Sequence, residues 1–110
     1  MAGKMTKIDA MQNYLKQMQK LKVKDMSAAE FGAIVDMLGA ANYQADASLV
    51  ATKDAAELEG VYTRFVADEL KISDKAAGMK LVKKVALKMK NEKRKYRAVF
   101  YYLLKQTAGK

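Results

Sequence analysis

Residues 27–39 read SAAEFGAIVDMLG and contain, in order, the start, the buried face and the end of one helix. Ser27 and Glu30 form a capping-box pattern, in which the serine hydroxyl accepts from the backbone N–H three residues on and the glutamate reaches back to the serine N–H. Gly39 suits the position just past the helix end. The buried face is predicted from apolar residues at helical spacing: Phe31, Ile34, Val35 and Leu38.

The same spacing continues on both sides of this segment. We expect an all-α fold, a compact orthogonal bundle of about five helices over residues 6–22, 27–38, 53–70, 74–90 and 93–106. The first helix is expected to bury Ile8, Met11, Leu15, Met18 and Leu21. Residues 40–52 are rich in turn-favouring side chains and are expected to form a loop with at most one short helical turn. Gly60 suggests a close helix crossing inside the third helix.

The composition favours helices over strands. Proline is absent, and alanine occurs 18 times against 15 for valine, isoleucine and threonine together. No strand is predicted. We expect residues 1–5 to be a disordered tail and residues 6–107 to form a single domain. The absence of a long apolar stretch, a signal-peptide pattern and cysteine leads us to expect a cytoplasmic protein with no membrane partner.

The residues needed for many catalytic sites are missing. With no histidine and no cysteine, Cys/His zinc sites and Ser-His-Asp triads are excluded, and no glycine spacing matches a phosphate loop. We therefore expect no enzyme, no catalytic residue, no metal, no cofactor and no small-molecule substrate. Asp46, Asp54 and Glu57 could hold Mg²⁺ or Ca²⁺. We favour a structural interpretation, in which Asp54 and Glu57 lie in the first turn of a helix and complement its dipole.

Charge is divided unevenly along the chain. Residues 1–24 carry six basic and one acidic side chain, residues 25–74 three and ten, and residues 75–110 twelve and one. These segments have net charges of +5, −7 and +11, which sum to the +9 of the whole chain. The basic last third could bind nucleic acid or another polyanion. The candidate residues share positions on the last two helices and the turn between them: Lys80, Lys83, Lys84, Lys88, Lys93, Arg94 and Lys95.

The alternative is that the basic ends pack beside the acidic middle, within one fold or across a dimer, with the rest as solvated surface. We favour this alternative. The leading hypothesis for function is accordingly a non-enzymatic interaction module that binds a protein partner or itself. Non-specific nucleic-acid binding through the basic last third is the second hypothesis. Membrane-surface binding is disfavoured, because a domain of this size needs its apolar stripes for the core.

Three strings stand out: residues 95–104 (KYRAVFYYLL), residues 43–51 (YQADASLVA) and residues 54–58 (DAAEL). Together they resemble a family of small bacterial proteins of uncharacterised role, domain of unknown function 2853, over roughly residues 42–105. The resemblance implies a compact helical domain of about this length and no assigned activity. Within these strings, we expect Arg97 to form a structural ion pair with Asp46 that fixes the loop against the last helix.

Overall fold

The computed structural model describes residues 6–44 and 46–110, and within them almost all regular structure is helical. The elements are α1 (Lys7–Lys20), α2 (Ala28–Leu38), the 3₁₀ helix η1 (Gly39–Tyr43), α3 (Ala55–Val61), the π-helix η2 (Tyr62–Ala67), α4 (Lys75–Lys88) and α5 (Arg97–Ala108). The all-α prediction is confirmed. Within the described residues, no helix is long and apolar enough to cross a membrane. The predicted tail over residues 1–5 lies outside the described part of the chain.

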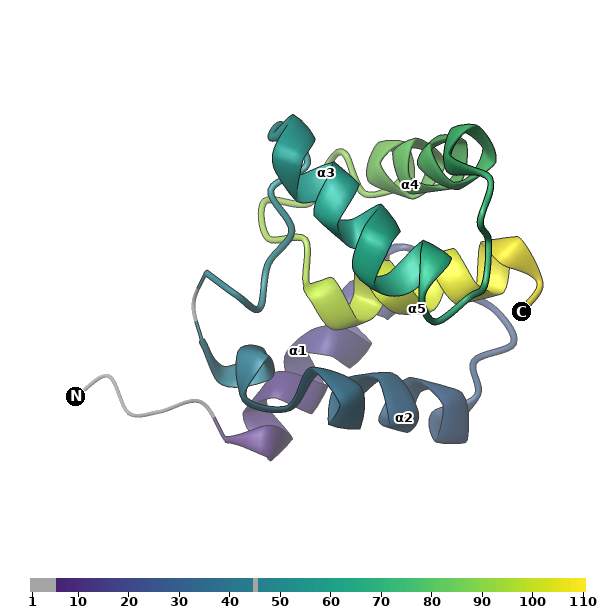
Figure 1. Cartoon of the computed structure of the whole chain (residues 1–110). Coiled ribbons are helices and arrows are strands. Elements are labelled where there is room, and N and C mark those ends of the chain that lie inside the picture. The colour runs from purple at the N-terminus through teal and green to yellow at the C-terminus, as the bar shows by residue number, and fades with distance from the viewer. Residues whose placement is uncertain (1–5, 45) are drawn as a thin grey trace.

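α5 is the centre of the fold. All seven residues from Ala98 to Leu104 are buried, which fits a helix that is apolar nearly all the way round. In Figure 1 this helix runs between α1 and α2 on one side and α3 and α4 on the other. The buried Tyr102 of this helix accepts, through its hydroxyl, from the backbone N–H of Ser27 at 2.6 Å. That contact ties α5 to the start of α2.

The N-terminus of α2 has one of the two hydrogen bonds of the predicted capping box. The Ser27 hydroxyl accepts from the backbone N–H of Glu30 at 3.2 Å, as expected. The Ser27 N–H is already used by Tyr102, so Glu30 does not cap it and lies instead 3.8 Å from the ammonium group of Lys105. Gly39 ends α2 with a φ of 54°, as predicted for a glycine at this position.

The predicted buried face of α1 is correct in part: Met18 is buried and Met11 and Leu21 pack against the core, but Ile8 and Leu15 do not. Ile8 is 70% exposed and Leu15 41% exposed, whereas the buried residues are Ala10, Tyr14, Gln17 and Met18. Two of these are polar, and both are satisfied. The Tyr14 hydroxyl donates to Asn42 Oδ1 at 2.8 Å, and Gln17 bonds to the segment before α5. Burial of a polar side chain costs little when its hydrogen bonds are made, so the apolar stripe alone misjudged part of the face.

The predicted third helix, 53–70, is shorter and widens along its length. α3 ends at Val61 and continues as the π-helix η2, while residues 68–70 form turns. The close crossing expected at Gly60 is at Gly78 of α4 instead. A Cβ placed on Gly78 would lie 2.3 Å from Cε1 of the Tyr62 ring, whereas the nearest group at Gly60 is the guanidinium of Arg64. The absence of a side chain at Gly78 lets α4 lie directly on η2.

The last helix begins at Arg97, four residues later than predicted. Residues 91–96 form a connection of turns and bends, and Tyr96 at its end makes an isolated antiparallel bridge with Leu49. This bridge is extended backbone that the sequence did not predict. The loop predicted over residues 40–52 contains the 3₁₀ helix η1 at its start, in agreement with one short helical turn.

Candidate nucleic-acid interface

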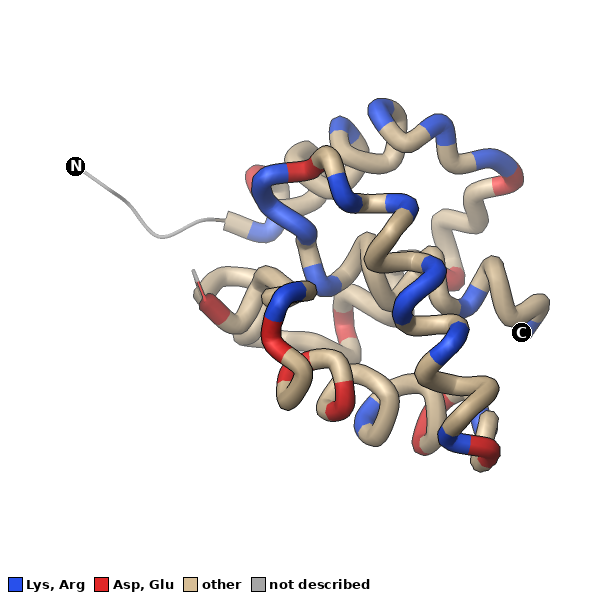
Figure 2. Tube along the Cα trace, turned by 90° about the horizontal axis from the view of Figure 1, so that it is seen from above, with Lys and Arg blue, Asp and Glu red and all other residues tan. Residues whose placement is uncertain are grey.

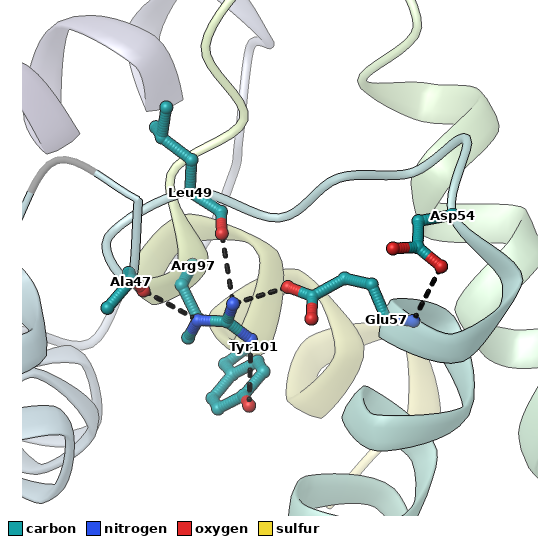
Figure 3. A network of polar contacts seen from close by, with 6 residues as sticks. All are labelled: Ala47, Leu49, Asp54, Glu57, Arg97 and Tyr101. Atoms are coloured by element: carbon teal, nitrogen blue, oxygen red, sulfur yellow. Dashed lines mark hydrogen bonds and ion pairs between the residues drawn. The ribbon is translucent and has the colours of Figure 1, made fainter.

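Arg97 lies at the centre of a half-buried polar cluster, drawn in Figure 3. Its Nε donates to the carbonyl of Ala47 at 2.8 Å and its Nη2 to the carbonyl of Leu49 at 2.9 Å. Nη2 also forms an ion pair with Oε1 of Glu57, and Nη1 lies 3.5 Å from the hydroxyl of Tyr101. The two ion-pair side chains are only 11% and 21% exposed. The guanidinium therefore fastens the loop before α3 to the start of α5.

The predicted ion pair between Asp46 and Arg97 is wrong in its acidic partner. Asp46 is exposed, and in the described part of the chain the carboxylate within ion-pair distance of Arg97 belongs to Glu57. Asp54 is also occupied, because its Oδ1 accepts from the backbone N–H of Ala56 at 2.9 Å and caps α3. Asp54 is thus the N-cap of α3 and Glu57 lies in its first turn, in line with the structural interpretation. Residues 6–44 and 46–110 contain no group of three or more acidic side chains arranged to hold a metal ion.

The charge of Arg97 is secured by its surroundings. Burial by itself lowers the pKa of the guanidinium, but hydrogen bonds to Tyr101 and Glu57, and the negative charges those groups can carry, outweigh burial, so that the pKa of Arg97 is raised above its ordinary value. An arginine held in this way stays protonated at every pH at which the protein is folded. Four of its five N–H donors are used within the protein, so the cluster fastens the loop before α3 to α5.

Next to this cluster, residues 91–96 form a surface loop whose backbone is held from two sides; we call it the clamped loop. From α1, the buried Gln17 donates to the carbonyl of Arg94 and accepts from the N–H of Tyr96 at 3.2 Å. From the other side, the N–H of Val50 donates to the carbonyl of Lys95 at 2.8 Å. The carbonyls of Arg94 and Lys95 and the N–H of Tyr96 are thus bonded within the fold, while the side chains of Lys93 and Arg94 are exposed.

The seven residues predicted to bind a polyanion fall on α4 and the clamped loop. Six are exposed: Lys80, Lys83, Lys84, Lys88, Lys93 and Arg94. The seventh, Lys95, is half-buried and donates to the carbonyl of Glu92 at 2.8 Å, so it is part of the loop's internal bonding. It drops out of the candidate interface because its ammonium group is already used.

The structure adds cations that were not singled out in the sequence. Lys16 and Lys20 of α1 line one hollow together with Lys93 and Arg94. Lys22 and Lys24, just after α1, line a second hollow with Lys88 of α4. Figure 2 shows the blue segments gathered along α4, the loop after it and α1. The net charge of +5 over residues 1–24 was the signal, but nothing in the sequence showed which side of the fold α1 occupies.

We define the basic face by its ten exposed cations: Lys16, Lys20, Lys22, Lys24, Lys80, Lys83, Lys84, Lys88, Lys93 and Arg94. In the described part of the chain, one of them has an acidic partner, Lys20, whose Nζ lies 3.6 Å from Glu92 Oε1. Three lysines elsewhere, Lys7, Lys75 and Lys105, each pair with a carboxylate of the acidic middle segment. The other nine cations of the basic face have no acidic partner in the described residues.

The fold and this surface define a small all-helical protein with a rigid backbone beneath a concentrated positive face. Residues 13–110 match the family model described as protein of unknown function (DUF2853), and the chain belongs to this family. The resemblance noted over residues 42–105 is confirmed and extends toward α1. No curated protein matches the chain.

Proposed function

We propose that the protein is a non-enzymatic nucleic-acid-binding module, cytoplasmic in location, that holds phosphate backbones on its basic face without reading base sequence. The observation that carries the proposal is the gathering of ten exposed cations from three elements onto one face, nine of them without an acidic partner in the described residues. Phosphate contacts by such side chains supply most of non-specific nucleic-acid affinity through release of counterions. No sequence motif is needed for this mode of binding.

The composition of the face supports backbone binding over base recognition. Nine of its ten cations are lysines, and Arg94 is the only arginine. A lysine ammonium is a compact point charge on a flexible chain, whereas arginine is the residue suited to bidentate contacts with guanine or phosphate. We therefore expect affinity to depend strongly on salt and weakly on sequence.

The test is binding of mixed-sequence DNA and RNA oligonucleotides over a series of salt concentrations. The logarithm of the association constant should fall linearly with the logarithm of the salt concentration, by about 0.9 per phosphate contact on duplex DNA. Reversal of two charges, Lys84→Glu with Lys88→Glu, should flatten that slope. The matched control is Arg64→Glu with Lys71→Glu, which changes the net charge equally at exposed positions outside the basic face. No detectable binding at about 50 mM salt would overturn the proposal.

Interaction with protein, including self-association, is the second candidate function. The observation in its favour is that acidic residues of the middle segment are exposed, among them Asp36, Asp46, Asp68 and Glu69. The basic face of one copy could meet this acidic surface of another. Light scattering over a range of protein concentration tests the idea: mass should rise with concentration and return to that of a monomer at high salt. A strict monomer at every concentration would remove self-association.

A further inference from the structure

A hollow lies between α1 and the clamped loop, on the basic face. It has a volume of about 570 Å³, within the range of small-ligand sites. Two cations stand on each rim, Lys16 and Lys20 from α1 and Lys93 and Arg94 from the loop. The carboxylate of Glu92, 3.6 Å from Lys20 Nζ, lines the hollow as well, so three of the four cations have no acidic partner in the described residues. Figure 2 shows these two segments side by side with blue residues on both. We call this hollow the α1 cleft.

Neutral groups that can bind a nucleobase lie between the charged rims. The amides of Asn13 and Asn91 line the cleft, and in residues 6–44 and 46–110 neither makes a hydrogen bond to the protein. Each amide offers donors and an acceptor, the combination that pairs with the edge of a base. The half-buried ring of Tyr96 forms part of the wall, and aromatic rings support bases by stacking.

The cleft is fixed before any ligand arrives. Gln17 lies in its floor and bonds to the carbonyl of Arg94, to the N–H of Tyr96 and to Glu92 Oε1, so the two rims are held at a set separation. The Tyr96 ring packs edge-on against Tyr14, with 5.3 Å between ring centroids. A site ordered in advance loses little entropy on binding.

We infer that the α1 cleft takes one nucleotide of a single-stranded nucleic acid, with its phosphate between the two cationic rims and its base against Asn13, Asn91 and Tyr96. This inference rests on the proposed function and narrows it to a class of ligand. A duplex stacks its bases inside a cylinder and presents only its outer backbone to the lysines of α4. An unpaired nucleotide can turn its base outward and enter a concave site.

The experiment compares the full-length protein's affinity for a fluorescein-labelled 12-nucleotide single strand, as DNA and as RNA, with that for the matching duplex. Asn13→Ala with Asn91→Ala removes both amides and leaves the charge unchanged. We expect single-strand affinity to fall on the order of tenfold, with duplex affinity and the salt slope of both ligands unchanged. The comparison variant, Lys80→Gln with Lys84→Gln, should lower both affinities and flatten both slopes. Urea midpoints of all variants confirm that each is folded.

The outcomes separate this inference from the function on which it rests. Equal affinity for single strand and duplex, with no effect of the asparagine substitutions, overturns the cleft assignment and leaves backbone binding in place. Absence of binding to either ligand overturns both. A loss confined to single strands, in DNA and RNA alike, supports the cleft. A loss confined to RNA supports it with a ribose contact added, because the 2′-hydroxyl distinguishes the two.

Discussion

Arg94 and Arg97 are three residues apart and have opposite surroundings. Arg97 donates to two carbonyls, pairs with Glu57 and lies against Tyr101 beneath the surface. Arg94 has its backbone carbonyl held by Gln17, and its side chain is exposed on the rim of the α1 cleft. The positive charge of Arg97 is paired within the fold, whereas that of Arg94 is exposed to solvent. The comparison shows that a few cations of this protein hold the fold together, whereas a larger number are exposed on its surface.

The largest effect we expect comes from substituting these two arginines in turn. Arg97→Ala leaves Glu57 half-buried without its partner and two carbonyls without a donor, and should lower the free energy of unfolding by about 3 to 5 kcal/mol. Arg94→Ala should change it by less than about 0.5 kcal/mol while it weakens nucleic-acid binding. Urea denaturation and oligonucleotide binding measure the two properties. Similar stability losses for both variants would contradict the comparison.

The same contrast explains which parts of the fold the sequence could predict. α2 and α5 carry dense apolar patterns and clear end signals, and both were placed correctly to within a few residues, apart from the late start of α5. α1 was placed correctly, but Ile8 and Leu15, two of the five residues expected to be buried, are exposed. A weak apolar stripe competes there with Tyr14 and Gln17, whose partners Asn42 and Tyr96 are 28 and 79 residues away. Hydrogen bonds over such separations leave no local pattern.

The site divides in the same way. Exposure of the α4 lysines followed from their spacing along a helix, and the importance of Arg97 followed from its place in a distinctive string. The acidic partner of Arg97 could not be predicted, because Asp46, Asp54 and Glu57 are close in sequence and only tertiary packing decides which of them pairs with it. Asp54 is taken by the N-terminus of α3, and the first turn of that helix carries Glu57, which pairs with Arg97 of α5. The contribution of α1 to the basic face could not be predicted, because the sequence does not show which loop α1 packs against.

A second prediction tests the buried region through pH. Burial, followed by the charges of Tyr43 and Tyr96, raises the pKa of Tyr14 from its ordinary value of 10.0 to about 12. The folded protein therefore holds this proton more tightly than the unfolded chain. Its contribution to stability is complete below pH 10 and is lost as the pH rises from 10 to 12, in total by roughly 2 to 3 kcal/mol.

The variant that isolates this effect is Tyr14→Phe, which cannot ionise at that position. At neutral pH it should be less stable than the wild type by about 1 kcal/mol, because Asn42 Oδ1 loses its donor. The difference should shrink and reverse as the pH is raised through this window, as measured by urea denaturation at fixed salt. A difference that stays constant with pH would mean that the phenol is equally hydrated in both states.

A third prediction concerns Gln17, which joins the two regions. Gln17→Leu keeps the size of the side chain but leaves the carbonyl of Arg94 and the N–H of Tyr96 without their partner. We expect a loss of about 2 kcal/mol in the free energy of unfolding. Because the clamped loop is loosened and α4 is untouched, single-strand binding should fall more than duplex binding. Equal losses for the two ligands would argue against a preformed cleft.

The smallest effect we expect has the opposite sign. Lys80, Lys84 and Lys88 stand four residues apart on α4, and like charges at this spacing destabilise a helix. Lys84→Glu replaces two repulsive pairs with two attractive ones and should raise the free energy of unfolding by about 0.5 to 1 kcal/mol at low salt, less as salt screens the charges. Thermal or urea midpoints at two salt concentrations measure the gain, with Lys84→Gln expected between the two.

That gain in stability should come with weaker nucleic-acid binding, so the two properties change in opposite directions at one residue. At Arg97, by contrast, a charge is held in place because the fold requires it. The row of lysines on α4 weakens its own helix, so the fold does not require it. Binding of a ligand that neutralises these charges would explain the row. Loss of more than about 1 kcal/mol in Lys84→Glu would place Lys84 with Arg97 instead, as a residue that the fold needs.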